Sequence, residues 1–183
     1  MDKGKYIAEL LIREGGEKYT DRAADRGGPT RWGVTEKTAR QFGYKGRMQE
    51  LPLEVAVSIY ALCYWRPQMI DDVSVISEPL AICMFDFGVN SGVSRSIRTL
   101  QRLLNVLNNG GLYYEDLVED GLIGAKTLVA LKAFSEKRGG EGVDILVRAF
   151  NASRIAFCVT LSANDESQEA NTYGWLSRVV HLV

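Results

Sequence analysis

The chain has 183 residues, enough for one substantial hydrophobic core and barely enough for two small domains. Apolar residues make up 46% and charged residues 25%, the balance of an ordinary folded protein, which argues against disorder. Lys and Arg total 22 against 23 Asp and Glu, giving a net charge of −1. A protein that holds nucleic acid or an anionic membrane without regard to sequence needs a basic excess, and this chain lacks one.

Glycine, asparagine and proline divide the chain into helical segments, and no period-2 pattern predicts a strand. Thr35 is placed to cap a helix, and Pro52 occupies the first turn of another. The segment 79–89 is apolar on all sides and is predicted to be the central buried helix. The predicted helices cover residues 5–13, 35–43, 52–67, 79–89, 94–107, 125–134, 143–161 and 173–182.

Three segments between these helices stand out. Residues 14–34 form a long loop rich in glycine and charge, and such loops in compact domains are usually functional. Asp120 and Gly121 shape a turn, and the polar, glycine-rich segment 137–142 marks a minor boundary. We therefore expect an all-α protein, one compact unit with two helical lobes.

The rare residue types exclude several chemistries. His181 is the only histidine, so a Ser–His–Asp triad, a Cys–His peptidase or a histidine-rich zinc site would rest on one residue near the C-terminus. Cys63, Cys83 and Cys158 are an odd number in apolar context, which predicts buried free thiols rather than disulfides. Neither a metal nor an organic cofactor is indicated, and carboxylates remain for acid–base work.

The sequence also predicts where the protein is made. The apolar stretch from Leu80 to Val89 is interrupted by Asp86 and is far too short to span a bilayer. The N-terminus lacks the apolar run and cleavage site of a secretory signal. We expect synthesis in the cytoplasm without membrane insertion, so that another component must carry or release the protein to an external substrate.

Glu14 stands at the end of the first predicted helix. It follows Leu11 by three residues and Ile7 by seven, which places it on the apolar stripe. An apolar wall and the negative end of a helix both favour the protonated form of a carboxyl group. A protonated carboxyl can act as the general acid on a glycosidic oxygen. Spacing alone favours the alternative, an ordinary glutamate at the end of an amphipathic helix, because Glu is common on helices.

The loop after Glu14 carries further candidates. Asp21 and Asp25 precede Gly27, and glycosidases commonly use a second carboxylate beside the acid. Asp25 is the better partner, with Thr30 able to orient a water, and Trp32 offers a stacking face for a sugar ring. The alternative for both aspartates is turn formation, which Asp favours by itself.

The run EGG…D…GGPTRWGVT, from Glu14 to Thr35, resembles the glycoside hydrolase family 108 muramidases. The later part resembles the peptidoglycan-binding region that accompanies them. The matching segments there are DFGVNSG at 86–92, SIRTLQRLL at 96–104, DGLIGAKTLVAL at 120–131 and YGWLSRV at 173–179. One departure follows Glu14: the family's tyrosine is replaced by Glu17 and Lys18, with Tyr19 two positions later.

The resemblance implies a lysozyme-like fold that hydrolyses the β-1,4 bond between N-acetylmuramic acid and N-acetylglucosamine. Glu14 is then the catalytic acid, with Asp25 and Thr30 stabilising the oxocarbenium-like state or positioning water. Residues 1–92 would form the catalytic lobe and residues 93–183 a helical peptidoglycan-binding lobe. The implied partner is bacterial peptidoglycan, cut by a monomer in the periplasm or cell wall. A holin or secretion machinery would provide export for phage lysis or local wall editing.

Several residues keep two interpretations. Tyr19, Trp32 and Tyr64 would line the substrate groove, with a core position the alternative for Tyr64. Asn90 is either a substrate-facing group or a helix C-cap. Trp175 is assigned to packing, with contact to a stem peptide as the alternative, and Asp86 in its apolar helix should pair with an arginine.

Two rival functions stay open. A wall-binding module without activity would keep the fold, although the intact Glu14 argues against it. A lytic transglycosylase would use a similar acid without water.

Overall fold

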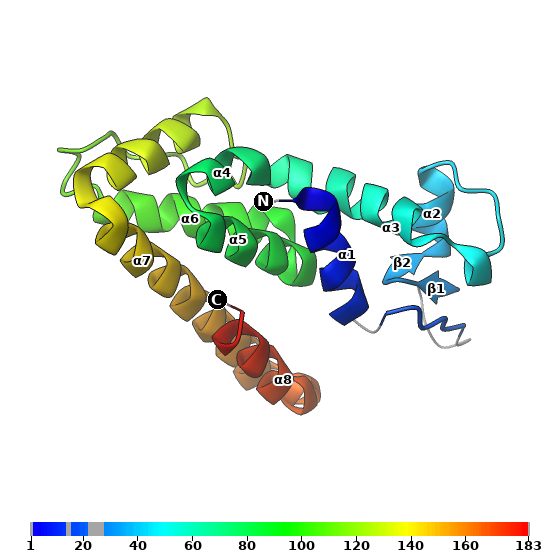
Figure 1. The fold of residues 1–183 in the computed structure, drawn as a ribbon. Helices are drawn as coiled ribbons and strands as arrows, with labels where there is room; N and C mark the ends of the chain where they lie inside the picture. Colours follow the sequence, from blue (N-terminus) through cyan, green and yellow to red (C-terminus); the bar gives the residue numbers. More distant parts are fainter. Residues whose placement is uncertain (1, 14–15, 22–27, 183) are drawn as a thin grey trace. The chain divides into compact units, whose positions relative to one another are not determined.

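The computed structural model describes residues 2–13, 16–21 and 28–182, and the catalytic candidates Glu14 and Asp25 lie outside these ranges (Figure 1). The chain divides into two compact units, Met1–Arg66 and Pro67–Val183. The division therefore follows Arg66, whereas the predicted lobe boundary lies at 92/93, between two helices of the second unit. The functional separation into a catalytic and a binding lobe stays a prediction.

The first unit packs α1 against α3 and carries a small hairpin. Its elements are α1 (Lys3–Arg13), β1 (Thr30–Arg31), β2 (Val34–Thr35), α2 (Glu36–Gln41), η1 (Met48–Glu50), α3 (Leu53–Tyr60) and η2 (Ala61–Trp65). The prediction that Thr35 caps a helix is confirmed, because its side chain accepts from the amide of Thr38. Pro52 is the N-cap of α3, one position before the first turn that the sequence predicted.

The hairpin corrects the expectation that the chain has no strand. Thr30 pairs with Thr35 and Arg31 with Val34 in an antiparallel ladder. Each strand has two residues, too short for an alternating pattern of side chains to appear in the sequence.

Among its described residues, the second unit consists of helices joined by turns and loops, the longest being the segment 108–124. After η3 (Arg66–Gln68), which bridges the two units in the sequence, come α4 (Ile70–Ile76), α5 (Glu78–Ser91), α6 (Val93–Leu107), α7 (Ala125–Asn164), η4 (Glu166–Gln168) and α8 (Glu169–Val180). Helix α5 contacts α4, α6 and α7 and buries residues on all its sides, as the sequence predicted (Figure 1). Helix α4 was not predicted from the sequence.

Helix α7 is broken at Gly139, whose φ of 63° and ψ of −165° are not helical. The break lies inside the predicted boundary 137–142 and separates two helices that the sequence also separates. By length and hydropathy alone α7 could cross a membrane, although a third of the apolar window is buried within the fold. An amphipathic core helix meets the same test, and α7 buries Leu146, Phe150 and Arg154 on one face.

A buried ion cluster holds α5, α7 and α8 together. Asp86 of α5 is 1% exposed and accepts from Arg154 Nη2 of α7 at 2.5 Å. Arg178 of α8 donates to both carboxylate oxygens, from Nε at 2.9 and 3.1 Å. The predicted pairing of Asp86 with an arginine is confirmed, with two partners rather than one.

Replacing Asp86 should destabilise the second unit strongly. In Asp86→Asn the buried charge of Arg154 loses its counter-ion, and breaking such a buried pair costs about 3–5 kcal/mol. The matched control is Glu119→Gln, which removes a surface pair with Arg102, a side chain 73% exposed, and costs at most about 1 kcal/mol. Urea unfolding of both variants measures the difference. Equal losses would contradict a structural role for Asp86.

The three cysteines are free thiols, as predicted, with Cys83 and Cys158 buried and Cys63 half-buried. Burial raises the pKa of the Cys83 thiol to about 11 and raises that of Cys63 by a smaller amount. Since the thiolate is the reactive form, a raised pKa lowers reactivity at any given pH.

We expect Cys83 to be the slower of these two thiols to react with a maleimide in the native protein at pH 8. Its side chain is fully buried as well as protonated, whereas Cys63 is partly accessible. Mass mapping of labelled peptides over time gives the order. Labelling of Cys83 first would show that its packing differs from that described.

Candidate functional site

The hairpin places the described part of the predicted catalytic loop. Thr20 and Thr30 form an antiparallel bridge, with amide-to-carbonyl distances of 2.9 and 2.8 Å in the two directions. The bridge ties the segment after α1 to β1. Thr30 is half-buried, and its hydroxyl donates to the carbonyl oxygen of Gly28 at 3.1 Å. A hydroxyl held in this way keeps its lone pairs available to accept from a water.

Trp32 is fixed at the tip of the hairpin. Its φ of 54° is left-handed, an uncommon backbone for a residue with a bulky side chain. The indole Nε1 donates to the carbonyl oxygen of Leu51 at 3.0 Å, so the ring cannot turn freely. The half-buried indole is therefore positioned by both its backbone and its one donor, which suits a sugar-stacking residue.

Gly33 completes the turn against Tyr60 of α3. With a φ of +70°, its backbone is in the region that favours glycine, and a Cβ would lie 2.5 Å from the Tyr60 hydroxyl oxygen. Tyr60 is buried, and desolvation raises its pKa to about 12. The tyrosine therefore stays protonated and packs closely under the hairpin tip. Neither residue was singled out by the sequence, since the contact depends on the fold.

Two further candidates have different environments. Tyr19 is half-buried and donates from its hydroxyl to Asp21 Oδ2 at 3.1 Å, which gives Asp21 a local structural partner. Desolvation and then this hydrogen bond raise the pKa of Tyr19. Tyr64 is half-buried, with its ring centroid 5.2 Å from that of Tyr60. Its groove-lining role stays a prediction, whereas Trp65 is 1% exposed and belongs to the core.

The apolar stripe before Glu14 is present in α1. Ile7, Leu10 and Leu11 are at most 1% exposed, and the helix ends at Arg13. Glu14 and Asp25 themselves lie outside the described residues, so their catalytic roles stay predictions. Among the described residues, no three His, Cys, Asp or Glu side chains gather in a way that could hold a metal ion.

Replacing Gly33 with alanine should destabilise the protein more than the same change at another glycine with a positive φ. Gly33→Ala introduces both left-handed strain, about 1–2 kcal/mol, and a contact with the Tyr60 hydroxyl. Gly43→Ala is the matched control, because Gly43 has a φ of +85° but no atom near the site of a Cβ. The loss in unfolding free energy should be larger for Gly33→Ala, and adding Tyr60→Phe should recover part of it. Equal losses would show that the Tyr60 contact is unimportant.

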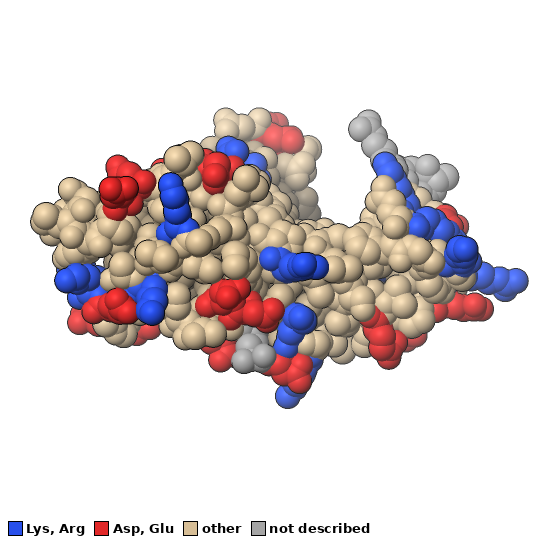
Figure 2. All heavy atoms as spheres, turned by 90° about the horizontal axis from the view of Figure 1, so that it is seen from above, with Lys and Arg blue, Asp and Glu red and all other residues tan. Residues whose placement is uncertain are grey.

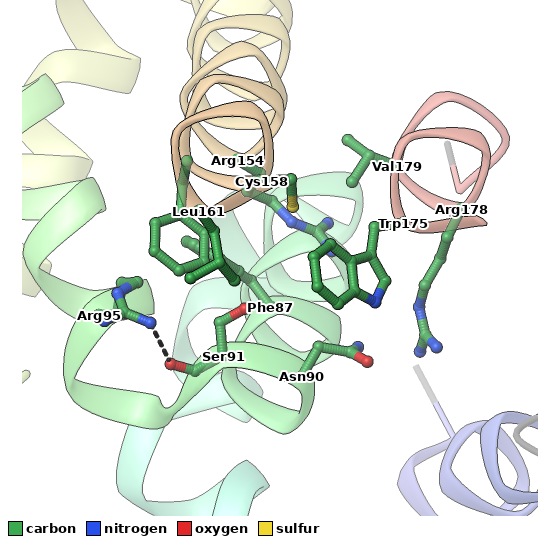
Figure 3. Close-up of a pocket in the computed structure, with 11 residues that line it drawn as sticks. Phe87, Asn90, Ser91, Arg95, Arg154, Cys158, Leu161, Trp175, Arg178 and Val179 are labelled. Carbon is green, nitrogen blue, oxygen red and sulfur yellow. Dashed lines mark hydrogen bonds between the residues drawn. The ribbon is translucent and has the colours of Figure 1, made fainter. Parts of the chain in front are cut away.

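A second polar site lies within the second unit, at the end of α5. A cavity of about 160 Å³ is lined by Asn90 of α5, Arg95 of α6, Arg154 of α7 and Trp175 of α8, among others (Figure 3). In this view the indole of Trp175 reaches from α8 toward the end of α5. Asn90 lies in the last turn of α5 and donates to the carbonyl oxygen of Asp86 at 2.7 Å. The C-cap of α5 is Gly92, so the alternative of Asn90 as a cap is wrong.

The predicted turn at Asp120 packs against α6. Gln101 Nε2 donates to Asp120 Oδ1 at 2.9 Å, and Gln101 Oε1 accepts from the amide of Gly121 at 3.0 Å. The hydrogen bond from Gln101 is the main cause that lowers the pKa of Asp120. This confirms that Asp120 and Gly121 shape a turn.

Two family models match consecutive parts of the chain. Residues 7–92 match the model described as glycosyl hydrolase 108, and residues 95–180 match the model described as a predicted peptidoglycan domain. The first match includes most of α1, the hairpin and α5, and the second includes most of α6 and all of α7 and α8. A comparison with curated proteins found no match.

A solved structure titled as that of SagA from Brucella abortus has a similar fold. It matches with a TM-score of 0.62 and 24% sequence identity, over 98% of this chain and 94% of that chain. The likeness therefore extends over both units. With the helical content described above, it confirms the predicted all-α, lysozyme-like fold class.

Proposed function

We propose that Glu14 is the general acid of a glycoside hydrolase acting on peptidoglycan, because residues 7–92 match the glycosyl hydrolase 108 family and residues 95–180 match a predicted peptidoglycan domain. The bond cut is the β-1,4 linkage between N-acetylmuramic acid and N-acetylglucosamine. The observation that carries the assignment of Glu14 is the buried stripe of Ile7, Leu10 and Leu11, which Glu14 continues in sequence.

In the proposed reaction Glu14 gives its proton to the glycosidic oxygen as the bond breaks. The sugar ring then develops positive charge, which the carboxylate of Asp25 stabilises, either directly or by activating a water with Thr30. Water then adds at the sugar carbon and gives its proton to the carboxylate that activates it. Trp32, held by Leu51, stacks on the sugar and positions it for this attack.

Wall clearing tests the role of Glu14. Glu14→Gln should lower the rate of turbidity loss of exposed peptidoglycan by about 10²-fold or more, because general acid catalysis contributes about 10²–10⁴-fold. Glu9→Gln is the control, since Glu9 is an exposed carboxylate on the same helix α1. Equal clearing by wild type and Glu14→Gln, or none by either, would reject the mechanism. The second outcome would favour a wall-binding module without activity.

Product analysis separates hydrolysis from transglycosylation. Mass spectrometry of the fragments should show reducing N-acetylmuramic acid ends, because water is the acceptor. Ends carrying 1,6-anhydro sugars would show that the muramyl hydroxyl is the acceptor, and would make the enzyme a lytic transglycosylase. Asp25→Asn should slow formation of the hydrolytic products if Asp25 stabilises the charge.

We further propose that the protein acts as a monomer in the periplasm or cell wall, where its substrate lies. A holin or a secretion machinery would deliver it, for phage lysis or for local editing of the wall. The genes adjacent to its own distinguish the two settings, since a lysis cassette and a secretion cluster encode different partners.

A further inference from the structure

The cavity at the end of α5 is rich in positive charge. Arg95, Arg154 and Arg178 all line it, and no Asp or Glu of the described residues does. Arg154 and Arg178 share the carboxylate of Asp86, which does not line the cavity. Among the described residues, the lining therefore carries three guanidinium groups and no carboxylate.

Arg154 is the most buried of the three. It is 2% exposed, and its Nε makes no hydrogen bond, although a buried donor is normally satisfied. Its guanidinium carbon lies 5.1 Å from the ring centroid of Phe87. A buried arginine that shares a carboxylate with a second arginine contributes positive potential to the cavity that it lines.

Arg95 lies at the exposed edge of the cavity, and some of its guanidinium N–H groups remain available to a ligand. It is exposed, and its Nη1 donates to the backbone carbonyl of Ser91 at 3.0 Å (Figure 3). Its guanidinium carbon lies 4.1 Å from the ring centroid of Phe157, which holds the group in place. No carboxylate pairs with it among the described residues. A guanidinium has five donors in a fork that fits a carboxylate, so Arg95 can bind one.

The remaining walls are apolar. Trp175, Phe157, Leu161 and Val179 line the cavity together with the side chain of Cys158. Its volume of about 160 Å³ is below the roughly 300–1,000 Å³ of sites for drug-sized molecules. Such a space accepts a small apolar group next to an anion rather than a disaccharide.

We propose that this cavity binds the carboxylate end of a peptidoglycan stem peptide, an inference that rests on peptidoglycan being the substrate. Arg95 binds the terminal carboxylate, and the positive potential of Arg154 and Arg178 attracts it. The methyl group of the terminal alanine packs on Trp175. The second unit would thereby recognise the peptide part of the wall rather than its sugars.

The surroundings of the cavity fit the rest of such a peptide. A wider cavity of about 570 Å³ shares Arg95 and Phe157 with the first and continues along α6 past Arg98 and Arg102. Arg98 donates to a backbone carbonyl, that of Asp120, and Arg102 pairs with Glu119. A peptide leaving the first cavity can therefore lie in the second, where further carboxylates of the stem meet basic side chains.

The positive charge of this cavity is local, because charges of both signs are mixed on the surface shown in Figure 2. The face in Figure 2 shows lysine and arginine side chains interspersed with aspartate and glutamate, without one large area of a single sign. The net charge of −1 provides no general attraction to an anionic wall. Recognition by charge must therefore come from a site such as the arginine cavity.

Calorimetric titration of the full chain tests the proposal. The protein carries Glu14→Gln so that nothing is cut, and the probes are a synthetic stem peptide ending in D-alanyl-D-alanine and the same peptide with an amide in place of its terminal carboxylate. The acid should bind about tenfold more tightly than the amide, the size of one charge-assisted hydrogen bond. Arg95→Gln should remove this difference, and Trp175→Ala should weaken both peptides equally.

Matched controls lie on the same helices. Arg148→Gln removes an exposed arginine of α7 that does not line the cavity, and Tyr173→Ala removes an aromatic side chain of α8 that is 85% exposed. Both should bind the acid like the parent protein, and unfolding midpoints verify that every variant is folded. Equal binding of acid and amide, no binding of either, or equal losses in Arg148→Gln and Arg95→Gln would overturn the proposal.

The peptides contain no glycosidic bond, so this test is independent of catalysis. Wall clearing by the wild type without peptide binding would reject the cavity assignment alone. Peptide binding without clearing would reject the hydrolase mechanism and leave the cavity assignment standing.

Discussion

The second unit depends on the carboxylate of Asp86, which lies in the core and is shared by two arginines. Asp86 comes from α5, Arg154 from α7 and Arg178 from α8, so one buried group joins three helices that are distant in sequence. The attraction between the charges offsets the cost of removing them from water only if this geometry is kept. The two guanidinium groups that meet this carboxylate, those of Arg154 and Arg178, also line the cavity at the end of α5.

The cluster around Asp86 therefore connects the stability of the second unit with the proposed recognition of a peptide carboxylate. In the proposed arrangement Arg154 and Arg178 both hold the helices and set the potential, while Arg95 at the rim is left to bind. A cluster that is charged for structural reasons therefore requires little further change to become an anion site. The first unit is arranged in a similar way, since Trp32 is held by one hydrogen bond to Leu51 and by the turn at Gly33. In both units, the groups proposed to meet substrate are positioned by neighbours that do not.

Much of the helical architecture was predictable. The apolar faces of α5 and α6, the cap at Thr35 and the break near Gly139 follow from local composition and spacing. The hairpin was missed because two-residue strands leave no periodic signal, and α4 because its seven residues are too few for one. Tyr60 was not identified because it lies 27 residues from Gly33 in the sequence, and no local pattern predicts that the two are in contact.

The family motif around Glu14, the helical class and the expected pairing of Asp86 with an arginine could all be inferred from the amino-acid sequence. These follow from residue type, spacing and the cost of burying a charge, which are local properties. The packed helices were needed to show which arginines meet Asp86, that Asn90 does not cap its helix, and that Arg95 and Trp175 line one cavity. Such contacts depend on how helices from distant parts of the chain pack, which no spacing along a single segment encodes.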